Sequence, residues 1–124
     1  MLIAGELTER VIGLAIEVHR HTGTGLLESV YEQCLCHELS EAGIPFERQV
    51  AIPVIYKSVS IGDGFKADIL VAREVIIEIK AVAAILPVHE AQLHTYLSMS
   101  KIRVGMILNF HARRLVEGIR RYVL

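Results

Sequence analysis

The segment from Phe65 to Val82 constrains the fold of this chain more than any other. It contains two apolar, β-branched runs separated by a short polar break at 72–74. Each run is long enough for one strand, so the pattern predicts a β-hairpin closed by a three-residue loop. In that hairpin Val71 faces Val75, and this first pair sets the register of all the others.

The register places three charged side chains on one face of the hairpin. Counting back from the loop sets Asp68 directly opposite Glu78, and Lys80 points to the same side two residues further on. Opposed side chains have Cβ atoms about 4.5–5.5 Å apart, so two carboxylates at these positions repel each other. Two interpretations are open. Either the charges form a structural ion pair on a half-exposed strand, or the carboxylates bind a divalent cation such as Mg²⁺.

Composition predicts one domain over residues 1–124 without a membrane segment. An apolar fraction of 52% and a charged fraction of 22% are ordinary for a globular chain, and no apolar run approaches the length of a membrane helix. The net charge of −1 means that any nucleic-acid surface must be local. The stretch 1–6 is too short and too poor in basic residues for a signal peptide, while Cys34 and Cys36 are badly spaced for a disulfide. We therefore expect a cytoplasmic protein.

Periodicity and turn residues predict the remaining elements. We expect helices at 7–21, 26–42 and 87–100, and strands at 46–56, 65–71, 75–82, 102–110 and within 113–124. Gly62-Asp63-Gly64 predicts a turn before the central hairpin. A strand, a helix and a second strand in succession predict a parallel βαβ unit. The order is α-α-β-β-β-α-β-(β), an α/β domain with a mixed sheet flanked by helices.

The second predicted helix carries an acidic residue in its first turn. Glu28 continues the apolar stripe that includes Tyr31 and Leu35, so we expect it to face inward. The alternative is an ordinary acidic residue at a helix N-terminus. On the third predicted helix, Gln92 and Tyr96 share one side because they are four residues apart.

Several segments resemble, in order and over nearly the whole chain, the motifs of the GxxExxY proteins. They are Gly25-Leu-Leu-Glu28-Ser-Val-Tyr31, Ala67-Asp68-Ile-Leu-Val, Glu78-Ile-Lys80-Ala-Val, His89-Glu-Ala-Gln92-Leu-His-Thr-Tyr96-Leu and Asn109-Phe110. That family is placed in the PD-(D/E)xK nuclease superfamily, which has a restriction-endonuclease-like α-β-β-β-α-β core. The chain departs from the pattern in having Ala67 where the superfamily name has proline, a common replacement.

The resemblance implies a phosphodiesterase that uses Mg²⁺, or Mn²⁺ in its place. Asp68 and Glu78 would be its metal ligands and Lys80 its catalytic lysine. Glu28 would be the acidic residue of the N-terminal helix, holding a water or a second metal. The polar pair Gln92 and Tyr96 would position the phosphate backbone or the attacking water.

Three hypotheses follow. The first is a metal-dependent nuclease acting on nucleic acid, with DNA favoured over RNA. The second is a non-catalytic nucleic-acid-binding or regulatory module that retains the nuclease fold, and the third is a purely structural role for the charged strand. A homodimer is compatible with so small a chain. Candidate contacts to phosphates are Lys66, Arg103, Arg113, Arg114, Arg120 and Arg121.

Overall fold

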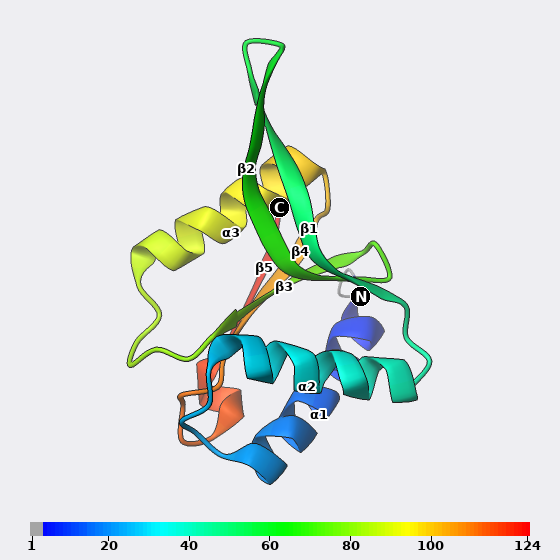
Figure 1. The fold of residues 1–124 in the computed structure, drawn as a ribbon, viewed down its shortest axis with the longest axis vertical. Coiled ribbons are helices and arrows are strands. Elements are labelled where there is room, and N and C mark those ends of the chain that lie inside the picture. Colours follow the sequence, from blue (N-terminus) through cyan, green and yellow to red (C-terminus); the bar gives the residue numbers. More distant parts are fainter. Residues whose placement is uncertain (1–3) are drawn as a thin grey trace.

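The computed structural model describes residues 4–124, with the main chain only for Asp63. The first three residues of the predicted domain therefore lie outside the described part. The elements in chain order are α1 (Gly5–Thr22), α2 (Glu28–Glu41), β1 (Phe46–Tyr56), β2 (Val59–Val71), β3 (Val75–Lys80), α3 (Pro87–Ser100), β4 (Val104–Asn109), the 3₁₀ helix η1 (Leu115–Gly118) and β5 (Ile119–Val123) (Figure 1). This order confirms the predicted α/β arrangement, including the short final strand.

The strands form one five-stranded sheet with the order β1-β2-β3-β4-β5. β3 and β4 are parallel and are connected through α3, as predicted, while the other neighbouring pairs are antiparallel. Alternate residues of β3 face opposite layers. Ile77 is buried in the apolar cluster that includes α1 and α2, whereas Ile76 is buried against Leu93 and Leu97 of α3. The sheet therefore lies between two layers of helices (Figure 1).

The turn between β1 and β2 is formed by Lys57 and Ser58. Both residues have positive φ, 49° and 66°, as two-residue hairpin turns of type I′ require. The predicted turn at 62–64 is wrong, because β2 continues through this segment with a register shift and Gly62 at φ 110°. A glycine at a β-bulge carries the same sequence signal as a glycine in a turn. Pro53 lies beside that irregularity on an edge strand, where proline is tolerated.

Candidate metal and active site

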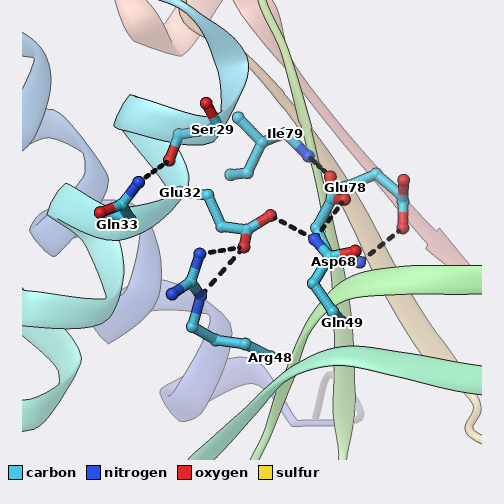
Figure 2. A network of polar contacts seen from close by, with 8 residues as sticks. All are labelled: Ser29, Glu32, Gln33, Arg48, Gln49, Asp68, Glu78 and Ile79. Atoms are coloured by element: carbon cyan, nitrogen blue, oxygen red, sulfur yellow. Dashed lines mark hydrogen bonds and ion pairs between the residues drawn. The ribbon is translucent and has the colours of Figure 1, made fainter.

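The hairpin of β2 and β3 brings Asp68 and Glu78 together. Its backbone pairing has the predicted register and ends at the pair Ile69–Ile77, one pair before the two carboxylates. From there the side chains join the strands. The main-chain N–H of Asp68 donates to Oε1 of Glu78 at 3.2 Å, and the N–H of Ile79 donates to Oδ2 of Asp68 at 2.8 Å (Figure 2). The predicted proximity is thus present, but the backbone pairing of β2 and β3 ends before the position at which Asp68 and Glu78 were predicted to pair.

Both carboxyl groups are withdrawn from water. Glu78 is only 7% exposed and Asp68 is half-buried. Burial, followed by the charge of Asp68, raises the pKa of Glu78 to about 8, and burial also raises the pKa of Asp68. Without a cation, the pair therefore retains a proton near neutral pH.

Lys80 ends β3 on the same face as Glu78. It is half-buried, and its positive charge acts on both Asp68 and Glu78, lowering their pKa values against the effect of burial. Among the side chains that the structure describes, no carboxylate lies within 4 Å of its ammonium group. The ammonium group is therefore near the carboxylates without being paired to either of them.

Tyr96 and Gln92 occupy different environments on α3. Tyr96 is buried, and burial together with the charges of Glu78 and Asp68 raises the pKa of its hydroxyl to about 12. It therefore remains a neutral hydrogen-bond donor close to the carboxylates. Gln92 is exposed one turn earlier, and within the described part of the chain no hydrogen bond involves its side chain.

Glu28 is the first residue of α2 and reaches the end of β3. Its Oε2 accepts a hydrogen bond of 2.9 Å from the N–H of Ala81, the residue that follows Lys80. The side chain is nevertheless exposed, so the expectation that it faces inward was wrong about its burial. The reason is that α2 begins at Glu28, which leaves this side chain at the solvent-facing rim of the helix.

The pattern Gly25-x-x-Glu28-x-x-Tyr31 has a clear structural role. Gly25 has φ 106°, a conformation that L side chains rarely adopt. The Tyr31 hydroxyl donates to the carbonyl oxygen of Gly23 at 2.6 Å, and its ring stacks on Phe110 with centroids 4.5 Å apart. These residues shape the turn into α2 and thereby direct Glu28 toward the end of β3.

Asn109 ties the chain after Lys80 to the neighbouring strand. Asn109 is buried at the end of β4, where it pairs with Lys80. Its Oδ1 accepts from the N–H of Val82 at 3.1 Å, and its Nδ2 donates to the carbonyl oxygen of Val82 at 2.9 Å. Asn109 of β4 therefore fixes the path of the main chain that follows Lys80.

Three residues beside the carboxylates, Glu32, Arg48 and Gln49, were not among the predicted site residues. Glu32 of α2 is 4% exposed. Its Oε2 accepts from Nε and Nη2 of Arg48 at 3.0 and 2.8 Å, and its Oε1 accepts from Nε2 of Gln49 at 2.8 Å (Figure 2). The same amide nitrogen lies 3.4 Å from Oδ1 of Asp68. The spacing of Glu32, one helical turn after Glu28, was the available signal for it, while nothing in the β1 pattern indicated Arg48 or Gln49.

The carboxylate oxygens of Asp68 and Glu78 suit a hard divalent cation. Asp68 and Glu78 each use one carboxylate oxygen on a main-chain N–H. Oε2 of Glu78 has no protein hydrogen bond among the described residues, and Oδ1 of Asp68 has only the long contact with Gln49. Mg²⁺ commonly binds through one or two carboxylates plus waters and phosphates. No group of three or more His, Cys, Asp or Glu side chains in the described chain could hold a metal, so an ion here would retain open positions.

The two cysteines take no part in this arrangement. Cys34 and Cys36 are both free, which agrees with the expected absence of a disulfide. Cys36 is buried, and burial raises the pKa of its thiol to about 11. The thiol therefore stays neutral and is a poor metal ligand.

A mixed sheet between helical layers, with two neighbouring carboxylates and a lysine on its second and third strands, defines a restriction-endonuclease-like protein. The family model described as the PD-(D/E)XK nuclease superfamily matches residues 5–122. The chain belongs to this superfamily, and its membership indicates a nuclease-type function. No curated protein and no solved structure gave a significant match. None of the described helices is long and apolar enough to cross a membrane.

Proposed function

We propose that this protein is a metal-dependent phosphodiesterase that cleaves nucleic acid, with DNA as the preferred substrate. The observation that supports it best is that Asp68 and Glu78 each use one carboxylate oxygen to accept from a main-chain N–H of the opposite strand, which leaves the other carboxylate oxygens for a cation. Lys80 then supplies a positive charge on the same face. A purely structural ion pair explains the arrangement less well, because Lys80 makes no close pair with either carboxylate.

Asp68 and Glu78 would hold Mg²⁺, or Mn²⁺ in its place. The bound ion would lower the pKa of a coordinated water and polarise a phosphoryl oxygen. The protein would contribute two carboxylates whose orientations are set by main-chain N–H groups, on the face of β3 that also carries the buried Ile76. Because burial and mutual repulsion disfavour two anions here, cation binding relieves an existing cost.

Lys80 is proposed as the catalytic lysine. Its ammonium group can donate hydrogen bonds to a phosphate oxygen or to the attacking water. A fixed positive charge in a half-buried site stabilises the negative charge that develops in the transition state. Glu28 and Asn109 position Lys80 by binding the main chain that follows it. Glu28 accepts from the N–H of Ala81, and Asn109 accepts from the N–H of Val82.

Three further side chains have proposed roles in positioning. Tyr96 would donate from its neutral hydroxyl, and Gln92 would contact the nucleic-acid backbone from the exposed side of α3. Glu28, besides binding Ala81, would use its second carboxylate oxygen to hold a water at the rim of the site.

The topology separates the candidate phosphate contacts. Because β3 and β4 are parallel, their C-terminal ends lie at the same edge of the sheet. The N–H of Phe110 donates to the carbonyl oxygen of Lys80 at 2.8 Å, so the loop that carries the exposed Arg113 and Arg114 begins beside the lysine. Arg103 precedes β4 at the opposite edge and donates to a main-chain carbonyl there. We therefore propose Arg113 and Arg114, and not Arg103, as phosphate contacts.

Two of the remaining candidates, Lys66 and Arg120, also differ in position. Lys66 is exposed on β2, two residues before Asp68, and is retained as a proposed contact. Arg120 lies on the edge strand β5, where its guanidinium group donates to the main-chain carbonyls of Glu117 and Ile119. We therefore assign Arg120 a local structural role.

The experiment that tests this function compares the wild-type protein with Lys80→Ala on single-stranded and double-stranded DNA and RNA. Cleavage by the wild type should require Mg²⁺ or Mn²⁺ and stop in chelator, and Lys80→Ala should abolish it while retaining Mn²⁺ binding. Mn²⁺ binding without cleavage of any substrate would instead indicate a non-catalytic module. Cleavage at an unaltered rate by Lys80→Ala would remove this lysine from the mechanism.

A further inference from the structure

The amide nitrogen of Gln49 lies between two carboxylates. Nε2 is 2.8 Å from Oε1 of Glu32 and 3.4 Å from Oδ1 of Asp68 (Figure 2). An amide –NH₂ group carries two hydrogens, so it can donate one hydrogen bond to each carboxylate. The backbone of Gln49 has φ 50°, which is uncommon for a residue other than glycine and has a conformational cost. The surrounding contacts therefore hold this residue in an unfavourable conformation that brings its amide to Asp68.

Glu32 determines which end of the Gln49 amide meets Asp68. A carboxylate only accepts hydrogen bonds, so it selects the nitrogen end of the amide and not the oxygen end. Glu32 is itself buried, and Nε and Nη2 of Arg48 both donate hydrogen bonds to its Oε2. With the amide turned the other way, its oxygen would repel both carboxylates.

We propose that Glu32 and Gln49 are positioning residues of the metal centre. Glu32 orients the amide of Gln49, and Gln49 holds the carboxylate of Asp68 in the orientation from which it binds the ion. This inference rests on the proposed function, because it takes Asp68 as a metal ligand. Asp68 then has one N–H donor on each oxygen, Gln49 on Oδ1 and Ile79 on Oδ2, and two donors together define the plane of the carboxylate.

The substitution Gln49→Leu tests this role, because it removes both N–H donors at similar volume. Loss of a hydrogen-bond partner of a metal ligand typically costs about 10–100-fold in affinity. The Kd for Mn²⁺, measured by calorimetry on the full chain without nucleic acid, should therefore rise about tenfold or more. The matched control is Gln33→Leu, since Gln33 is exposed on α2 and donates only to the carbonyl oxygen of Ser29 in its own helix (Figure 2). This control should leave the Kd unchanged.

A double-mutant cycle tests whether Glu32 acts through Gln49. Glu32→Gln should weaken Mn²⁺ binding in the wild-type background, because the donors of Arg48 select the oxygen of the new amide and leave its –NH₂ group facing Gln49. The nitrogen end of the Gln49 amide is then no longer selected. The same substitution should have little further effect in the Gln49→Leu background. An equal loss of affinity in both backgrounds would overturn the proposed order of action.

The remaining outcomes distinguish this inference from the function on which it rests. If Gln49→Leu does not fold in chelator, Gln49→Asn serves instead, because asparagine tolerates positive φ and its shorter side chain cannot bridge both carboxylates. The same rise in Kd is expected. A wild-type protein that binds no Mn²⁺ would contradict the metal centre and this inference together. If the Kd for Mn²⁺ is the same for the wild type and the Gln49 variants, the positioning role alone is overturned.

Discussion

Oε1 of Glu78 accepts a hydrogen bond from the main-chain nitrogen of Asp68 at 3.2 Å, at the point where β2 and β3 stop pairing. The carboxylate of Asp68 accepts in turn from the N–H of Ile79 on the opposite strand. These two side chains therefore hold the parting strands together and also form the proposed metal site. Substitutions at either position should consequently change both stability and metal binding, and the two effects can be measured separately.

The stability of the metal-free protein should depend on the ionisation of Glu78. Its pKa is raised from 4.5 to about 8, so the folded protein binds this proton more tightly than the unfolded chain. The resulting stabilisation is present at low pH and is lost as the pH rises from about 4.5 to about 8. Asp68, whose pKa is also raised, adds a contribution of the same sign.

Glu78→Gln should remove this pH dependence because glutamine does not titrate. In chelator, the free energy of unfolding of the wild type should fall relative to that of Glu78→Gln by up to a few kcal/mol between pH 5 and pH 8.5. Denaturant titrations at several pH values measure the difference. A difference that stays constant with pH would mean that Glu78 titrates normally.

Asp68→Asn should stabilise the metal-free protein and abolish its response to metal. The asparagine can still accept from the N–H of Ile79, but it no longer repels the ionised Glu78. At pH 8.5 in chelator we expect a gain of about 0.5–1 kcal/mol, the scale of opposed cross-strand pairs. Mg²⁺ at ten times its Kd should stabilise the wild type by about 1.4 kcal/mol and the variant not at all. Thermal unfolding with and without Mg²⁺ measures both, and a variant less stable than wild type in chelator would instead indicate a structural network.

The buried hydroxyl of Tyr31 should contribute to stability through the turn into α2. Tyr31→Phe leaves the carbonyl oxygen of Gly23 without its 2.6 Å donor, which should cost about 1–2 kcal/mol. Tyr56→Phe is the control, because Tyr56 is 60% exposed near the turn between β1 and β2. Chemical unfolding should show a clear loss for the first substitution and little change for the second. Equal effects would remove the special role of the Tyr31 hydroxyl.

Nucleic-acid binding should depend on the loop after β4. Replacing both Arg113 and Arg114 by glutamine should weaken binding and reduce the slope of log K against log salt by about 1.8 for duplex DNA, since each phosphate contact contributes about 0.9. The control replaces Lys101 and Arg103, two cations at the opposite edge of the sheet. Fluorescence anisotropy in chelator prevents cleavage during the measurement. Equal losses from both pairs would indicate non-specific attraction instead of a defined contact.

Much of the fold could be predicted because its signals are local. The apolar alternation of 46–56 and the proline at the start of α3 gave element bounds that match the structure. The failure at Gly62 has an equally local cause, because glycine permits both a turn and a bulge, and only the pairing of β2 with β1 decides between them. The burial of Glu28 was misjudged because helical periodicity does not reveal where a helix begins.

The proposed site likewise has one part that the sequence determined and one part that depends on the tertiary structure. The break at 72–74 and the alternation on either side of it determined by themselves that Asp68 and Glu78 would meet, because a hairpin loop sets its own register. Only the tertiary structure brought Glu32 from α2 and Gln49 from β1 to Asp68, since that contact depends on how α2 docks on the sheet and on one left-handed backbone residue. Periodicity along the chain determines which face a side chain occupies, whereas the packing of distant elements determines which side chains it meets there.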